Sequence, residues 1–159
     1  MKFIIHYLTE EYAKQLCTWR YQGEYSVYDF PAWDIAVQQN QGITNSKIRE
    51  ADFRSVVDEK GNFIGFFRMS EDEAGKIEIG LGLKPEYCGS GFGKDFVKVI
   101  TQYALTQRPN CLIYMEVRTF NARAVKCYQA CGYSIALKHH RVLPWGDDDY
   151  FRMEYQSNC

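Results

Sequence analysis

The chain has 159 residues, a formal net charge of -1 and 46% hydrophobic residues. This length suffices for a single domain, residues 1–159, that buries its core without metals or disulfides. Charges of both signs are interspersed and no stretch is long enough to span a membrane, so we expect neither nucleic acid nor membrane as a partner. The six cysteines form no Cys-x-x-Cys pair. Free thiols in a soluble, cytoplasmic protein are therefore predicted.

The first part of the sequence is predicted to contain helices and a β-hairpin around an aromatic loop. A strand at 3–7 precedes a helix that begins after Thr9, a favourable N-cap residue, and ends near residues 21–23. Residues 21–31 are rich in aromatic side chains but have neither a helical nor a strand period, which indicates a loop. The elements predicted next are a helix from Pro31 through Val37, a polar connection at 40–46, strands at 53–57 and 63–69, and a charged turn at 70–76.

Residues 88–93 read Cys-Gly-Ser-Gly-Phe-Gly and stand between a predicted strand and a predicted helix. The apolar run 77–83 predicts the strand, and residues 94–105 have the apolar spacing of an amphipathic helix. Three alternating glycines leave a tight turn without side chains, so that successive N–H groups can converge on an anion. The positive end of the following helix favours the same ligand. The pattern therefore predicts a turn that binds phosphate.

Two common phosphate-binding motifs do not fit this turn. A P-loop ends in Gly-Lys-Ser/Thr, whereas here Asp95 follows Gly93-Lys94 and removes the hydroxyl that binds magnesium. A dinucleotide-binding turn belongs near the start of a βαβ unit, whereas this one follows three strands of antiparallel appearance.

The last third of the sequence completes a mixed α/β pattern. Asp147–Asp149 are interpreted as a solvated turn, and His139 and His140 as surface residues of a strand rather than metal ligands. The order of strands and helices predicts an α/β (α+β) fold with a mixed sheet flanked by helices. The elements expected here are a strand at 111–118, a helix capped by Asn121 and ended by Gly132, and strands at 133–137 and 150–155.

Residues 53–155 resemble the GNAT N-acetyltransferase superfamily in two separate motifs. Gly91 and Gly93 occupy the two glycine positions of its acetyl-coenzyme A loop. The preceding strand and turn match at Glu78-Ile79-Gly80 and Pro85-Glu86-Tyr87. The second motif matches at Asn121, Ala124, Tyr128, Gly132 and Tyr133. The resemblance implies a strongly twisted mixed sheet, splayed between two parallel central strands at 77–83 and 111–118, with acetyl-CoA in the splay.

The resemblance also implies which residues bind the co-substrate. Cys88 departs from the family, which usually has Gln or Arg there, so we expect weakened coenzyme binding with the backbone donors retained. No metal is expected, and a homodimer is a possible assembly. The implied cofactor-binding residues are Leu81, Leu83, Gly89, Ser90, Gly91, Phe92, Gly93, Lys94, Asn121 and Tyr128.

Glu116 and Tyr128 are the implied catalytic pair. The Glu-Val-Arg segment at 116–118 and its twelve-residue interval to Tyr128 are similar to ribosomal-protein N-terminal alanine acetyltransferases, where the glutamate is the base and the tyrosine the acid. Glu78 and bulk water are alternative bases. A backbone N–H near Leu83 is a candidate for holding the oxyanion.

The implied activity is acetyl transfer to a primary amine, either a small amine or a peptide N-terminus, by direct attack in a ternary complex. A non-catalytic acyl-CoA-binding module is the alternative. The aromatic loop falls where the superfamily builds one wall of its acceptor cleft. The implied acceptor-binding residues are Tyr25, Tyr28, Asp29 and Phe30.

Overall fold

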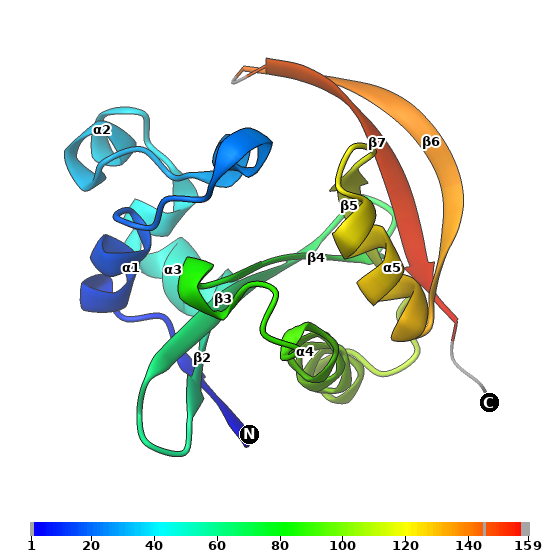
Figure 1. Ribbon diagram of the computed structural model, residues 1–159, viewed down its shortest axis with the longest axis horizontal. Coiled ribbons are helices and arrows are strands. Elements are labelled where there is room, and N and C mark those ends of the chain that lie inside the picture. Colours follow the sequence, from blue (N-terminus) through cyan, green and yellow to red (C-terminus); the bar gives the residue numbers. More distant parts are fainter. Residues whose placement is uncertain (1, 145, 157–159) are drawn as a thin grey trace. The chain divides into compact units, whose positions relative to one another are not determined.

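The computed structural model describes residues 2–144 and 146–156 (Figure 1). The chain divides into two compact units, one formed by residues up to 68 with 81–92 and the other by 69–80 with the residues from 93 onward. Strands β3 (Phe63–Glu71) and β4 (Ile77–Leu83) each pass from one unit into the other. The strands follow the hydrogen-bonded order β1-β2-β3-β4-β5-β7-β6. The predicted mixed sheet is confirmed.

The first unit contains an antiparallel sheet and several short helices. β1 pairs with β2, and β2 pairs with β3, both antiparallel. Its core joins eight buried residues from the helices and strands, against which Tyr12, Phe30 and Trp33 pack. The core residues are Leu8, Ala13, Leu16, Trp19, Ile43, Phe53, Phe63 and Phe66. The elements that lie wholly in this unit are β1 (Phe3–Tyr7), α1 (Glu10–Leu16), η1 (Gly23–Tyr28), α2 (Trp33–Gln38), η2 (Gly42–Thr44), α3 (Ser46–Asp52), β2 (Phe53–Asp58) and η3 (Pro85–Tyr87).

Two predictions for this unit were wrong. Thr9 caps α1 as predicted, accepting a hydrogen bond from the N–H of Tyr12 at 3.1 Å, but the helix ends at Leu16. The following residues turn, and the Arg20 guanidinium donates to the Cys17 carbonyl at 3.0 Å. Helix α3 lies where no helix was predicted. Its N-cap is Asn45, whose side-chain oxygen accepts from two backbone N–H groups.

Gly82, near the end of β4, gives room to a core aromatic ring. A Cβ added to Gly82 would overlap Cε1 of Phe66 and come within 3.1 Å of its Cζ. Phe66 is 9% exposed, and its ring lies 5.8 Å from that of Phe30. The ring is held on more than one side, so it cannot move away freely.

We therefore expect Gly82→Ala to lower the free energy of unfolding by about 1–3 kcal/mol, the usual cost of overpacking a core. The matched control is Gly80→Ala on the same strand, because nothing lies within 4 Å of a Cβ at Gly80. Denaturant titration of both variants measures the difference. Equal stabilities would show that the Phe66 ring relaxes without cost.

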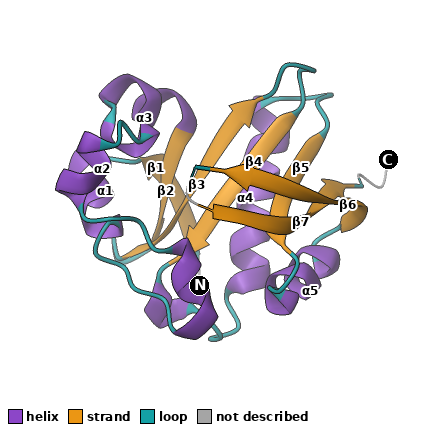
Figure 2. Ribbon diagram, turned by 90° about the horizontal axis from the view of Figure 1, so that it is seen from above, coloured by secondary structure: helices purple, strands orange, loops and turns teal. Residues whose placement is uncertain are grey.

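The second unit is arranged around strand β5. β5 pairs in parallel with the start of β4, where Ile77 is opposite Ile113 and Glu78 is opposite Tyr114. On its other side β5 pairs antiparallel with β7, which pairs antiparallel with β6 (Figure 2). The elements that lie wholly in this unit are α4 (Gly93–Gln107), β5 (Ile113–Arg118), α5 (Ala122–Ala130), β6 (Tyr133–Leu143) and β7 (Gly146–Tyr155).

The strands of this unit have one apolar and one polar face. Ile113, Met115 and Val117 alternate along β5 and are buried, as is Met153 on β7. Tyr114, Glu116 and Arg118 point the other way, because successive strand residues alternate between the faces. The amphipathic helix predicted at 94–105 is confirmed as α4, whose buried residues include Phe96, Val97, Ile100 and Ala104.

β6 and β7 are longer than predicted. Asp147–Asp149, interpreted from the sequence as a solvated turn, lie in β7 and pair with Val142, Arg141 and His140. Three consecutive aspartates are unfavourable in a strand by propensity alone. Opposite charges on neighbouring strands, described below, offset that preference.

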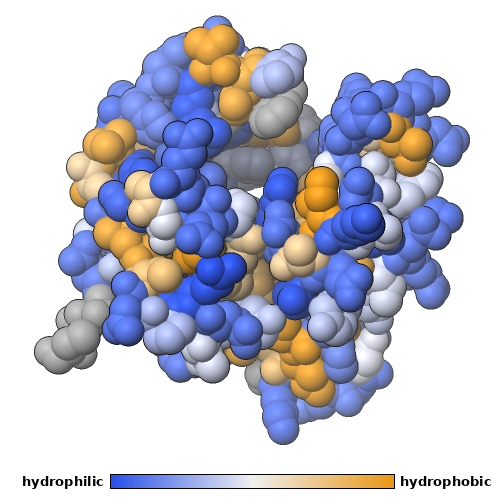
Figure 3. All heavy atoms as spheres, turned by 180° about the vertical axis from the view of Figure 1, so that it is seen from behind, coloured by the Kyte–Doolittle hydropathy of each residue, from blue (hydrophilic) through white to orange (hydrophobic). Residues whose placement is uncertain are grey.

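The outer surface seen in Figure 3 is mostly hydrophilic, with hydrophobic residues in small scattered groups. Scattered apolar residues of this kind are normal for a protein surface. Within 2–144 and 146–156, no helix has the length and apolar composition needed to cross a lipid bilayer.

Candidate active site

The glycine turn has the backbone conformation that its sequence predicts. Gly89 and Gly91 have backbone φ angles of +74° and +88°, values that residues other than glycine rarely adopt. The Ser90 hydroxyl donates to the Tyr87 carbonyl and fixes the first part of the turn. Among the described residues, no acceptor is found for the backbone N–H groups of Gly89, Gly91 and Phe92. These donors remain available to a ligand.

Helix α4 begins at Gly93, directly after the turn in the sequence. The first four N–H groups of any α-helix have no acceptor within the helix, and the helix dipole makes this end positive. The glycine turn and the start of α4 each offer backbone N–H donors. This is the property required to hold a phosphate group.

Cys88 packs against the end of β4. Its thiol lies 3.7 Å from both the Leu83 and the Lys84 carbonyl oxygens. The Tyr21 hydroxyl also donates to the Leu83 carbonyl, at 2.8 Å, and burial raises the pKa of Tyr21. Lys84 forms an ion pair with Glu86 at 2.6 Å. The carbonyl of Leu83 and the charge of Lys84 are thus engaged within the protein.

The aromatic loop combines structural contacts with half-buried tyrosines. The Asp29 carboxylate accepts from the N–H of Tyr21 at 2.9 Å, and Phe30 packs against the core. Tyr25 and Tyr28 lie in η1 and are half-buried. Asp29 and Phe30 therefore have clear roles in shaping the loop. Acceptor binding by these four residues stays a prediction.

The second sequence motif forms α5 and its two ends. The side-chain oxygen of Asn121 accepts from the N–H of Ala124 at 3.1 Å and caps the helix. Gly132 follows the helix with φ of +97°, which favours glycine at this position. Tyr133 then enters β6, and its buried hydroxyl lies 2.7 Å from that of Thr101 on α4. The ring of Tyr128 lies 6.2 Å from the ring of Tyr133.

Two thiols lie near the start of α4 but are poorly suited to carry an acyl group. A Cβ on Gly93 would be 3.5 Å from the Cys127 sulfur, and the Cys131 thiol lies 3.6 Å from the Lys94 carbonyl. Burial raises the pKa of Cys127 to about 11 and also raises that of Cys131. Thiols with raised pKa values are weak nucleophiles near neutral pH.

Glu116 and Tyr128 lie on different elements and contact different partners. Glu116 extends from the polar face of β5, and its carboxylate Oε2 lies 2.7 Å from Nε2 of His139 on β6. The Glu116 side chain is 11% exposed and that of His139 is 34% exposed. His139 was expected from the sequence to lie on a strand, without a partner. The pairing of β6 with β7 and of β7 with β5 brings it across to Glu116.

Arg152 on β7 lies between these strands on the same polar face. It is opposite Glu116 in the register, and its guanidinium lies 3.7 Å from the centre of the Tyr114 ring. Its Nε donates to Glu154 at 3.1 Å, but its buried Nη2 has no hydrogen-bond partner in the part of the chain that is described. The Tyr114 hydroxyl donates to Asp72 at 3.0 Å. Burial, followed by this hydrogen bond, raises the pKa of Tyr114 to about 12.

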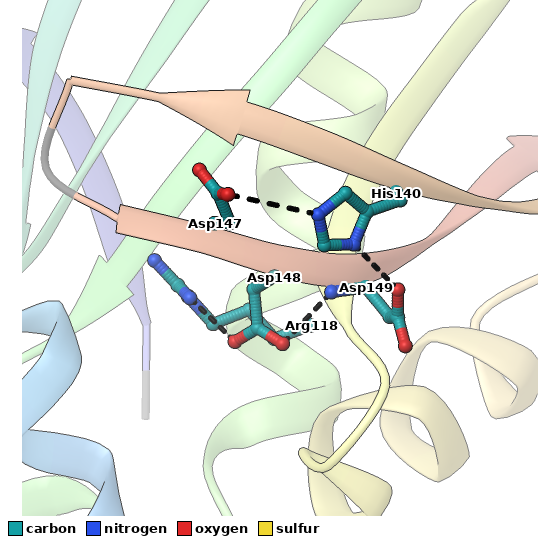
Figure 4. A network of polar contacts seen from close by, with 5 residues as sticks. All are labelled: Arg118, His140, Asp147, Asp148 and Asp149. Carbon is teal, nitrogen blue, oxygen red and sulfur yellow. Dashed lines mark hydrogen bonds and ion pairs between the residues drawn. The ribbon is translucent and has the colours of Figure 1, made fainter.

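The three aspartates of β7 alternate between the two faces of the sheet (Figure 4). Asp148 pairs with Arg118 at 2.6 Å, and the hydrogen bond from Arg118 lowers the pKa of Asp148. Asp147 and Asp149 flank His140 on the other face, at 3.9 and 2.9 Å. The hydrogen bond that His140 donates to Asp149 raises the pKa of His140. His139 and His140 therefore point to opposite faces and have separate partners.

The parallel pair β4 and β5, the glycine turn before α4 and the capped helix α5 define an acyltransferase type of α/β fold. The family profile described as the acetyltransferase (GNAT) family matches residues 8–133. The chain therefore belongs to the GNAT acetyltransferase family, whose members are N-acetyltransferases. No curated protein matches the chain in sequence.

Solved structures of spermidine N-acetyltransferases have the same fold. The SpeG enzyme from Vibrio cholerae in complex with CoA and spermine is 19% identical, with a TM-score of 0.70, over 96% of this chain and 94% of that one. A chimera of the Vibrio cholerae enzyme and hSSAT, exchanged at R149-K152, is 21% identical with a TM-score of 0.71, over 98% and 95% of the two chains. At this identity the likeness concerns the fold alone.

Within the described residues, no group of three or more His, Cys, Asp or Glu side chains is arranged to hold a metal ion.

Proposed function

We propose that this protein transfers the acetyl group of acetyl-CoA to a primary amine by direct attack while both molecules are bound. The observation that carries the proposal is the glycine turn. Its Gly89, Gly91 and Phe92 N–H groups have no acceptor among the described residues, and it leads directly into α4. Family membership gives this turn its expected ligand, the pyrophosphate of the coenzyme.

The turn leaves its backbone open to an anion. Nothing lies within 4 Å of a Cβ built on Gly91, so the backbone there can be approached closely. Lys94 and Lys98, near the start of α4, bring positive charge of the appropriate sign. Cys88 supplies no cationic side chain, so the binding rests on backbone donors. The proposed cofactor-binding residues are Leu81, Leu83, Gly89, Ser90, Gly91, Phe92, Gly93, Lys94, Asn121 and Tyr128.

The acceptor must lose a proton before it attacks. At pH 7 about 10% of an α-amine with a pKa near 8 is neutral, but only about 0.04% of an amine near 10.4. A base is therefore most useful for strongly basic amines. We propose that Glu116 takes part in removing this proton from the acceptor amine. We also propose that Tyr128 donates a hydrogen bond to the departing thiolate.

A small polyamine is the first acceptor to test. The fold is shared with a spermidine N-acetyltransferase whose structure contains CoA and spermine, and this supports a small-molecule amine. The Glu116 carboxylate lies on the polar face of β5, in contact with His139 rather than with an arginine, and suits a cation. A peptide N-terminus is the second acceptor class.

The experiment is thiol release from acetyl-CoA by the purified protein, with spermidine, a simple monoamine and a peptide with a free N-terminus. We expect turnover with at least one amine and none with its N-acetylated form, which serves as the matched control. Binding of acetyl-CoA without thiol release would instead support the non-catalytic acyl-CoA-binding module. Absence of binding would contradict both.

A further inference from the structure

We propose that His139, held in place by Glu116, is the general base that takes the proton from the acceptor amine, and that Glu116 is its positioning residue. This inference rests on the proposed acetyl transfer. It changes the expected role of Glu116 from direct base to partner of the base.

The exposed fractions of the two side chains show that Glu116 lies deeper in the protein and that His139 lies closer to solvent. The side chain of Glu116 is 11% exposed, whereas that of His139 is three times as exposed, at 34%. An amine that reaches this face from solvent meets the imidazole first. The 2.7 Å contact between Oε2 of Glu116 and Nε2 of His139 occupies one ring nitrogen.

The other ring nitrogen is available. Of the residues that the structure describes, none forms a hydrogen bond with Nδ1 of His139. When Nε2 carries the proton and donates it to the carboxylate, Nδ1 presents a lone pair. The carboxylate thus selects the tautomer and then stabilises the imidazolium that forms when Nδ1 accepts a proton. The same logic operates in catalytic triads.

A histidine is chemically better matched to this task than a glutamate. Ordinary imidazole and carboxyl groups differ by about two pKa units, and imidazole is the more basic. Proton removal from an ammonium group is therefore about a hundredfold less unfavourable with imidazole as acceptor. In the proposed arrangement the His139 imidazole accepts the proton and the more deeply buried Glu116 carboxylate supports it. Glutamate, a weak base, then does not have to accept the proton itself.

Several charged groups surround His139 on this face. Tyr150 is opposite it on β7, with ring centres 6.4 Å apart. The guanidinium groups of Arg118 and Arg141 lie 5.3 and 5.2 Å from the Tyr150 ring. The charge of Arg118 is balanced by Asp148, and that of Arg152 by Glu154. Glu116 is therefore the carboxylate in direct contact with the imidazole.

The proposed steps balance as follows. The ammonium group of the acceptor gives one proton to Nδ1 of His139, and the neutral amine then attacks the thioester carbonyl carbon. The C–N bond forms, the C–S bond breaks, and the sulfur leaves as a thiolate. The second proton of the attacking nitrogen ends on that sulfur through the Tyr128 hydroxyl. The imidazolium finally releases its proton to water.

The test compares His139→Ala with His140→Ala, using the amine that the wild-type protein acetylates. We expect kcat/KM at pH 7 to fall about 100- to 10,000-fold for His139→Ala, the usual range for a lost general base. His140→Ala is the matched control, since its side chain lies on the opposite face and forms its ion pairs with Asp147 and Asp149. Acetyl-CoA affinity should be unchanged in both variants.

Two further readouts separate a base from a structural residue. Free imidazole in the assay should partly restore His139→Ala, and the loss should shrink as the pH approaches the pKa of the amine. His139→Gln, which retains a polar group that can contact Glu116, should be slow although folded. A loss below tenfold in both His139 variants, or a loss that neither imidazole nor high pH reduces, overturns the proposal while the acetyltransferase function stands. A wild-type protein that acetylates no amine overturns the proposed function itself.

Discussion

Tyr128→Phe is expected to lower turnover about 100- to 10,000-fold and to leave the affinity for acetyl-CoA nearly unchanged. The hydroxyl is proposed to act only when negative charge develops on the sulfur, so its loss affects the transition state more than the bound substrates. A phenol with an ordinary pKa near 10 transfers its proton to a thiolate near 8.5 at a cost of about 2 kcal/mol. A hydrogen bond to the developing thiolate avoids most of that cost. Steady-state kinetics and calorimetric titration measure the two quantities.

Tyr133→Phe is the matched control for Tyr128→Phe. The Tyr133 ring is the neighbour of Tyr128 at 6.2 Å, but its hydroxyl is buried against Thr101. Its removal should lower the free energy of unfolding by about 1 kcal/mol, the typical net value of one hydrogen bond, without changing turnover. A loss of turnover below tenfold in Tyr128→Phe would identify Tyr128 as a packing residue.

The sequence predicted the elements best where one local pattern determines the structure. Strand β4 was predicted at its observed bounds, because an apolar run is followed by Pro85 and the glycine turn. The caps at Thr9 and Asn121 were also predicted, since a short polar side chain satisfies a free N–H wherever a helix begins. These features depend on neighbours within a few residues.

The missed elements depend on partners far away in the sequence. Helix α3 has seven residues and one buried side chain, Arg49, which donates to the Ile43 carbonyl at 2.9 Å. A helix this short has no readable apolar period. The aspartates of β7 form a strand because Arg118 and His140 lie on neighbouring strands. Strand propensity alone favoured a turn.

The same reason limited the prediction of the candidate active site. Glu116 was proposed from its local segment, but its contact with His139 requires β6 and β7 to be paired beside β5. The two residues are separated by 23 positions. A histidine in a strand of mixed composition gives no signal of that contact. The contact between His139 and Glu116 follows only from the pairing and register of the three strands.

Gly91→Thr is expected to weaken acetyl-CoA binding about 5- to 100-fold. Nothing lies within 4 Å of a Cβ at Gly91, so a Cβ placed there meets no protein atom. Its effect comes from the backbone, because φ of +88° is strained for a β-branched residue by about 1–3 kcal/mol. Relief of that strain moves the neighbouring N–H groups away from the positions proposed to hold the pyrophosphate. Each 1.4 kcal/mol lost in binding raises the dissociation constant tenfold.

Ser90→Thr introduces the same side chain one residue earlier and is the control. Ser90 has no positive φ, and threonine retains the hydroxyl that donates to the Tyr87 carbonyl. Its dissociation constant should stay within about twofold of the wild-type value, which is less than 0.5 kcal/mol. Calorimetric titration with acetyl-CoA, and with CoA alone, compares the two variants. Equal affinities would mean that the coenzyme pyrophosphate does not rest on the backbone of this turn. A loss confined to acetyl-CoA would place the effect at the thioester, because the pyrophosphate is common to both ligands.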